Sequence, residues 1–209
     1  MADKIIITVG RQTGSGGRII AKQVADDLGI PYYSREILDE ASKQSGMSKE
    51  FLLKSDEKKK SSLLYSFAMN TYAYGIGGDE LPLGTRVYLA QFDAIRAIAA
   101  QGSCVLVGRC ADYFLRDEPG LVRVFITADP DDRIAHIMEE KNVNEKGARE
   151  IIRKRDKERA AYYDFNTDGK WGVAANYDLC LNSTRLGVDG CVKMIKAFVE
   201  AKQEAKKEP

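Results

Sequence analysis

The stretch Gly10-Arg11-Gln12-Thr13-Gly14-Ser15-Gly16-Gly17-Arg18 decides the fold of this 209-residue chain. It follows the β-branched run Lys4–Val9 and precedes a segment in which Ile20, Val24 and Leu28 share one helical face. Glycines between a strand and a helix let backbone N–H groups curl around an anion, and the helix N-terminus adds the positive end of its dipole. The alternative is a tight turn that needs glycine for its geometry alone. We favour a phosphate-binding loop, whose residues are Thr13, Gly14, Ser15, Gly16, Gly17 and Arg18.

The loop departs from both common glycine patterns. A dinucleotide-binding turn requires G-x-G-x-x-G, and the third glycine of that pattern falls on Ile19. The P-loop pattern is G-x-x-x-x-G-K-S/T. Anchored on Gly16, its first glycine falls on Arg11, its lysine on Gly17 and its hydroxyl residue on Arg18. We therefore expect Arg18, or alternatively Arg11, to supply the positive charge that the lysine usually provides.

Five apolar runs predict the strands of a sheet. Runs such as Val105-Leu106-Val107 and Val124-Phe125-Ile126 do not alternate with polar residues, which is typical of parallel strands buried on both faces. Segments with helical spacing separate them, and Asp129-Pro130 and Asn144 are typical of helix starts. The pattern predicts an α/β fold with right-handed crossovers. The predicted strands are Lys4–Val9, Pro31–Tyr33, Cys104–Gly108, Leu121–Thr127 and Tyr177–Leu181.

Composition and charge disfavour several classes of function. Lys and Arg number 32 against 31 Asp and Glu, so a formal net charge of +1 gives no global attraction to nucleic acid or membrane. No apolar run approaches the ~20 residues that span a bilayer. The first residues lack a signal-peptide layout, so we expect a cytoplasmic protein.

The cysteines predict neither a disulfide nor a metal site. Cys104, Cys110, Cys180 and Cys191 are scattered, and His136 is the single histidine. Cys104 and Cys180 lie inside strand-like runs, where a thiol usually behaves as a small buried hydrophobe. We therefore expect both of these thiols to be buried.

The order of several motifs is informative beyond any one of them. These motifs are Gly14–Ala21, Leu28–Glu36, Val107–Asp112, Arg155-Asp156 and Leu181–Thr184. Together they resemble the cytidylate kinase-like family of P-loop nucleoside monophosphate kinases, over about residues 4–198. The resemblance implies a three-layer P-loop kinase fold, with a five-stranded parallel sheet, helices on both faces, a helical insert and a lid. It implies a single domain over 1–209, with the insert at about 37–86, the lid at about 144–175 and a frayed tail at 202–209.

The resemblance also implies a reaction, the transfer of the γ-phosphoryl group of ATP, as its Mg²⁺ complex, to CMP or a related nucleoside monophosphate. Such transfer requires mainly positioning and cations around the phosphate oxygens. Arg109 is then expected to hold the acceptor phosphate, with Arg35 and Asp112 near the acceptor pocket. Arg155 is expected to reach the phosphates from the lid, with Arg153 or Arg159 as a helper. The catalytic candidates are Arg155, Arg159 and, on the loop, Arg18.

Some of these assignments have simpler alternatives. Arg155 and Arg159 are four residues apart among acids, which is also typical of a solvated helix face with weak ion pairs. Asp112 could equally cap the helix that follows it. His136 lies within a helical segment and is expected to be a packed or surface residue rather than a general base.

The missing loop lysine leaves two other functions open. One is a catalytically weak regulatory module that binds a nucleotide or another anion, and the other is a kinase for a different small-molecule acceptor. Catalysis is favoured if Arg18 points into the loop, and the binding module is favoured if Arg18 pairs with an acid elsewhere. Small-molecule nucleotides are the predicted partners, and no oligomeric state is predicted.

Overall fold

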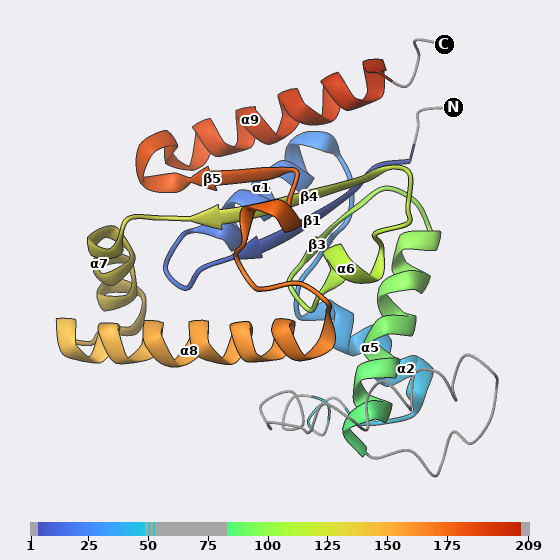
Figure 1. The fold of residues 1–209 in the computed structure, drawn as a ribbon, viewed down its shortest axis with the longest axis horizontal. Coiled ribbons are helices and arrows are strands. Elements are labelled where there is room, and N and C mark those ends of the chain that lie inside the picture. Colours follow the sequence, from blue (N-terminus) through green and yellow to red (C-terminus); the bar gives the residue numbers. More distant parts are fainter. Residues whose placement is uncertain (1–3, 49, 51, 53–82, 206–209) are drawn as a thin grey trace. The chain divides into compact units, whose positions relative to one another are not determined.

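A five-stranded parallel sheet is the framework of the computed structural model, which describes residues 4–48, 50, 52 and 83–205. The order of the strands is β2-β3-β1-β4-β5, so the strand that leads into the glycine-rich turn lies at the centre (Figure 1). All five predicted strands are confirmed. Their bounds are β1 (Ile6–Arg11), β2 (Tyr32–Tyr33), β3 (Cys104–Val107), β4 (Leu121–Thr127) and β5 (Leu179–Asn182).

The chain divides into two compact units, one formed by Met1–Ser34 with Gln101–Pro209 and the other by Arg35–Ala100. The second unit contains α2 (Glu36–Ser45) and α5 (Leu83–Ala100), which pack through a small apolar cluster. Much of the predicted insert, including Gly75 to Gly78, lies outside the described residues. The insert, the lid and the single domain therefore stay predictions.

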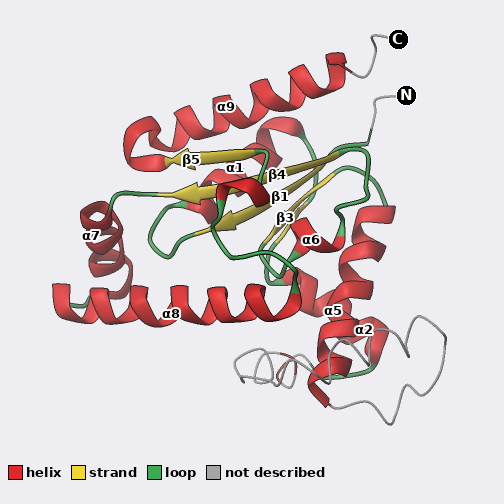
Figure 2. Cartoon of the chain, viewed as in Figure 1, coloured by secondary structure: helices red, strands yellow, loops and turns green. Residues whose placement is uncertain are grey.

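Alternation along the strands directs side chains to the two faces of the sheet. Ile7 and Val9 of β1 are buried with Val24 of α1 (Gly17–Leu28) and Ile195 of α9 (Ser183–Ala205). Phe125 alternates with the β4 residues of that cluster and therefore points to the opposite face. The short helix α6 (Ala111–Phe114) lies against β1 and β4, in front of the sheet in Figure 1. Helices thus cover both faces, as predicted (Figure 2).

The two strand cysteines differ in exposure. Cys104 is buried, as expected, and burial raises the pKa of its thiol to about 11. Cys180 is exposed, so the prediction that it is buried is wrong. It lies in β5, the edge strand of the sheet, where one side of the strand has no neighbouring strand to cover it.

After β4 the chain forms two successive helices that pack on each other, α7 (Pro130–Lys141) and α8 (Glu145–Asn166). Figure 1 shows α7 beyond the arrowheads of β4 and β5. The predicted cap of α8 is confirmed, because the Asn144 side chain accepts the Gly147 N–H at 2.9 Å. Asp129 is the N-cap of α7, but its side chain makes no capping bond and instead binds Asn182. No helix in the described part of the chain is long and apolar enough to cross a membrane.

Candidate phosphate-binding site

The turn between β1 and α1 presents a row of unused backbone donors. Gly14 and Gly16 have φ angles of 81° and 69°, a left-handed conformation that glycine adopts without strain. Within the described residues, the N–H groups of Gly14, Gly16, Gly17 and Arg18 have no hydrogen-bond acceptor. They sit at the start of a 12-residue helix, whose dipole is positive there. The turn is therefore suited to hold an anion.

Contacts from distant parts of the chain fix the conformation of this turn. The Thr13 N–H donates to Asp156 Oδ1 at 2.8 Å, and Arg133 Nε donates to the Thr13 carbonyl at 2.7 Å. On the other side, the Ser183 hydroxyl donates to the Ser15 carbonyl at 2.9 Å. A Cβ atom at position 14 would lie 2.6 Å from the carbonyl oxygen of Arg133, so Gly14 is required for this approach. These contacts hold the conformation of the loop without a ligand.

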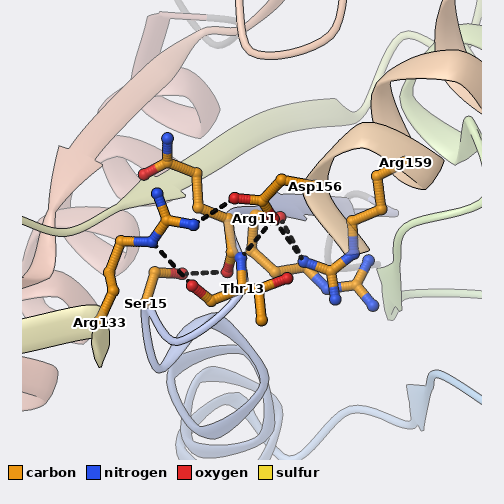
Figure 3. A network of polar contacts seen from close by, with 7 residues as sticks. Arg11, Thr13, Ser15, Arg133, Asp156 and Arg159 are labelled. Carbon is orange, nitrogen blue, oxygen red and sulfur yellow. Dashed lines mark hydrogen bonds and ion pairs between the residues drawn. The ribbon is translucent and has the colours of Figure 1, made fainter. Parts of the chain in front are cut away.

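One carboxylate, that of Asp156, lies between two guanidinium groups (Figure 3). Arg133 Nη2 pairs with Asp156 Oδ2, and Arg159 Nη1 lies 3.6 Å from Oδ1. Arg159 also donates to the Arg11 carbonyl at 3.0 Å. Burial lowers the pKa of Arg159 to about 10, against the opposing effect of Asp156 and with the help of neighbouring arginines. The middle of α8 is thus docked on the loop by charged groups.

The Arg11 side chain crosses the site from β1. A Cβ atom at position 17 would lie 2.6 Å from Arg11 Cβ, and one at position 108 would collide with Arg11 Nη1. The Nε atom of Arg11 is buried and has no hydrogen-bond partner in the described part of the chain. Burial, followed by the charges of Arg159, Arg18 and Arg109, lowers the pKa of Arg11 well below its usual value.

Most of the arginines proposed from the sequence meet here. Arg18 is exposed and forms no hydrogen bond or ion pair with a described residue, yet its charge acts on both Arg11 and Arg159. Arg155 is exposed on α8, and its charge also acts on Arg159. Arg109 follows β3, and its charge acts on Arg11.

The turn that carries Arg109 is conformationally unusual. Gly108, Arg109 and Cys110 have φ angles of 77°, 58° and 55° in succession. A non-glycine residue in this region costs roughly 1–3 kcal/mol, and such residues cluster at functional sites. The surrounding structure therefore holds the Arg109 backbone in place at the carboxyl end of β3, where ligands bind in open α/β sheets.

Two further residues were predicted near the acceptor pocket, Asp112 and Arg35. Asp112 is buried inside α6, whose N-cap is Cys110, and it accepts the Tyr163 hydroxyl at 2.7 Å. Burial raises the pKa of Asp112. Arg35 is exposed at the N-cap of α2, in the second unit. The acceptor-binding roles of both residues stay predictions.

Sequence reasoning did not include Arg133 in the site. This residue lies in the first turn of α7, just after the carboxyl end of β4, and its side chain is only 11% exposed. Its place after a central strand was an available signal, because ligands of open α/β sheets bind at these strand ends.

The strand order and the glycine-rich turn between the central strand and α1 define a P-loop kinase fold of the α/β class. The chain belongs to the cytidylate kinase-like family, whose model matches residues 6–185. An uncharacterized protein from Eubacterium ventriosum ATCC 27560 is 31% identical, with a TM-score of 0.69 over 94% of this chain and 99% of that one.

Two named kinases share the fold at low identity. Shikimate kinase from Bacteroides thetaiotaomicron is 12% identical, with a TM-score of 0.52 over 95% of this chain and 99% of that one. A gluconokinase from Sinorhizobium meliloti 1021 is also 12% identical, with a TM-score of 0.51 over 98% of this chain and 96% of that one. A search of curated proteins gives no significant match.

Proposed function

We propose that this chain is an ATP-dependent phosphotransferase that moves the γ-phosphoryl group of ATP to a nucleoside monophosphate, with a CMP-like acceptor. One observation carries the proposal, namely that arginines from four separate segments gather at a glycine-rich turn with unused N–H donors. Phosphoryl transfer requires this combination of positioning and positive charge. The gathered arginines are Arg11, Arg18, Arg109, Arg133, Arg155 and Arg159.

The donor side of the site is the loop itself. The unused N–H groups of this loop suit the phosphate chain of ATP, because aligned amides and a helix dipole favour negative charge. They are those of Gly14, Gly16, Gly17 and Arg18. Arg18 makes no ion pair with an acid in the described part of the chain. This supports phosphoryl transfer over the binding module, which is favoured if Arg18 pairs with an acid elsewhere.

The acceptor side is Arg109, with Arg155 reaching from α8. A planar guanidinium can bind two phosphate oxygens at once, which suits an acceptor that already carries a phosphate. Membership in the cytidylate kinase-like family supports a nucleoside monophosphate as that acceptor.

Mg²⁺ fits this site as a partner of ATP rather than as a resident ion. Within the described ranges, no three His, Cys, Asp or Glu side chains gather closely enough to hold a metal. In kinase sites Mg²⁺ keeps several waters and takes phosphate oxygens as ligands. The Thr13 hydroxyl is buried in the loop and has no hydrogen-bond partner among the described residues, so it is a side-chain oxygen that could join them. When bound, the ion would neutralise phosphate charge.

The test is ADP release from ATP–Mg²⁺ with a panel of nucleoside monophosphates. We expect turnover with CMP or a close relative. Arg109→Ala should raise the KM of the acceptor about 10- to 150-fold, because a charge-assisted contact contributes about 1.5–3 kcal/mol, and should change the KM of ATP far less. Arg149→Ala removes an exposed arginine paired with Glu145 and is the matched control. An equal effect of Arg109→Ala on both substrates would contradict its assignment to the acceptor.

A second candidate is a catalytically weak module that binds a nucleotide or another anion. It is favoured by the Asp156 carboxylate, which takes the Thr13 N–H at the start of a loop that has no lysine. ATP binding without turnover of any acceptor would select this module or a kinase for another small molecule. Adding non-nucleotide hydroxyl acceptors to the panel separates these two.

A further inference from the structure

Two positions of the phosphate loop have exchanged residue types. In the regular P-loop pattern, position 11 is the first glycine and position 17 is the lysine. In this chain position 11 is arginine and position 17 is glycine. These two positions together still carry one cation, but it now comes from the end of β1 instead of the start of α1.

The two positions are in direct contact, so the exchange is coupled. A Cβ atom at Gly17 would lie 2.6 Å from Cβ and 3.1 Å from Cγ of Arg11, and 3.3 Å from Cβ of Ile126. These atoms form the fixed base of the Arg11 side chain, not its flexible tip, and Ile126 is fully buried. An arginine at position 11 in this conformation therefore excludes a side chain at position 17.

The charge of Arg11 has no counterpart within the described residues. Its side chain forms no hydrogen bond or ion pair there, and its Nε atom is buried. The charges that act on it most strongly are those of Arg159, Arg18 and Arg109. A buried charge is costly unless an opposite charge compensates it. A polyphosphate on the adjoining N–H groups is an anion that would do so.

We propose that Arg11 is the phosphate-binding cation of this loop and replaces the lysine that Gly17 displaces. The inference rests on the proposed function, because it assigns a residue to the same loop, and it names the polyphosphate chain of a nucleoside triphosphate as the group that Arg11 binds. Arg18, on the exposed first turn of α1, then acts as a second cation rather than as the replacement.

The test measures binding of inorganic tripolyphosphate and of ATP–Mg²⁺ by calorimetry. Arg11→Gly should weaken both about 10- to 150-fold, the range for one charge-assisted contact. Gly17→Lys should also weaken binding, because the new side chain collides with Arg11. The double variant Arg11→Gly/Gly17→Lys should recover to within a few-fold of the wild type, since it restores the glycine and the lysine of the regular pattern. Arg149→Ala is the control for a lost positive charge and should bind as the wild type does.

Arg11→Met separates a binding role from a structural one. It keeps the unbranched base of the side chain and removes a partly buried charge that has no counterpart among the described residues, so the ligand-free protein should have an unchanged or higher Tm. Tripolyphosphate should raise that Tm much less than it raises the Tm of the wild type. A lower ligand-free Tm with an unchanged ligand-induced shift would show that Arg11 is structural and would overturn the inference.

The remaining outcomes separate this inference from the proposed function. Wild-type binding that Arg11→Gly leaves intact, or a double variant no better than Arg11→Gly, overturns the role of Arg11 whether or not a kinase activity is found. Binding that depends on Arg11 without any phosphoryl transfer supports the inference and counts against the kinase. Failure of the wild type to bind either tripolyphosphate or ATP overturns both.

Discussion

Helix α8 makes two unlike contacts on one face. Asp156 and Arg159 meet the phosphate loop through charges. Tyr163, one turn further on, is buried and donates its hydroxyl to Asp112. Residues three and four apart share a helical face, so one face of α8 serves both contacts.

The second contact is continuous with a packed aromatic group. Tyr163 interacts electrostatically with Tyr177, whose ring centroid lies 4.9 Å from that of Phe125 in β4, and the Phe125 centroid lies 5.4 Å from that of Trp171. We call Tyr163 and this group the aromatic contact. Gly172 has a φ angle of 73°, and a Cβ atom there would lie 3.3 Å from the Phe125 ring. No phosphate group can replace these buried aromatic contacts, so we expect them to persist when a ligand binds.

The charged contact is of another kind, because each of its groups could bind a phosphate instead. Arg133 and Arg159 would exchange a carboxylate for a phosphate oxygen, and the Thr13 N–H would do the same. The difference indicates that α8 is anchored by its aromatic end, while its middle is the part able to exchange partners. The following predictions test that division.

The largest effect is expected at the anchor, from Phe125→Ala. Deleting a buried aromatic ring costs about 3–5 kcal/mol of unfolding free energy, since a cavity remains. Phe125 is 2% exposed, so little of that loss can be relieved by water. Urea unfolding measures it, with Phe125→Leu as a milder control. A loss under about 1 kcal/mol, the scale of a conservative core swap, would show that this end is not the anchor.

At the charged contact we expect Asp156→Asn to strengthen binding while weakening the fold. The amide can still accept the Thr13 N–H, but it no longer competes as an anion, so tripolyphosphate should bind about tenfold tighter, or about 1.4 kcal/mol. The ligand-free protein should lose about 1–3 kcal/mol, because Arg133 loses a charged partner.

Glu158→Gln is the matched control for Asp156→Asn. It removes one negative charge from the same helix at an exposed position, 4.0 Å from Lys154. We expect a change of less than twofold in affinity, since exposed charges are screened. Weaker binding by Asp156→Asn would mean that this carboxylate positions Arg133 and Arg159 for the ligand instead of competing with it.

The sequence predicted the sheet because its signals are local. Each strand is a short apolar run, and the run at 121–127 matches β4 to the residue. The helix start at Asn144 also depends on a bond to a residue only three positions away. The prediction that Cys180 is buried was wrong because exposure depends on which strand lies at the edge of the sheet. The order of the strands cannot be inferred from the residues of a single apolar run.

The site was predicted only in part because its contacts span the chain. Thr13 and Asp156 are 143 residues apart, and Thr13 and Arg133 are 120 apart. Arg18 and Arg109 were accessible to sequence reasoning because both follow strand ends that a motif marks. The contact of Arg11 with Gly17 needed coordinates, since it depends on the direction in which one side chain leaves β1.

Asp112, which accepts the Tyr163 hydroxyl, should make the free energy of unfolding depend on pH. Burial raises the folded-state pKa of Asp112 above its unfolded value, so its contribution is greatest below the unfolded pKa, near 3.8. That contribution should be lost as pH rises through the folded pKa. Asp112→Asn does not ionise and still accepts the Tyr163 hydroxyl. The stability of the wild type minus that of Asp112→Asn should therefore fall as the pH rises above about 3.8, as urea unfolding measures, whereas parallel curves would refute an ionisable Asp112.

The smallest effect is expected from a charge pair at the aromatic end, Lys170 with Asp164. Their Nζ and Oδ2 atoms are 3.1 Å apart, but the Lys170 side chain is 72% exposed. An exposed pair of this kind contributes about 0–1 kcal/mol, so Lys170→Ala should change the unfolding free energy by less than about 0.5 kcal/mol. Asp164 keeps its bond from the Trp171 N–H at 2.9 Å, which does not need the lysine. If instead Lys170→Ala lowered the unfolding free energy as much as Asp156→Asn does, charge alone would explain the contribution of the loop contact to stability. We expect it to lie in burial, because Arg133 and Asp156 are only 11% and 17% exposed.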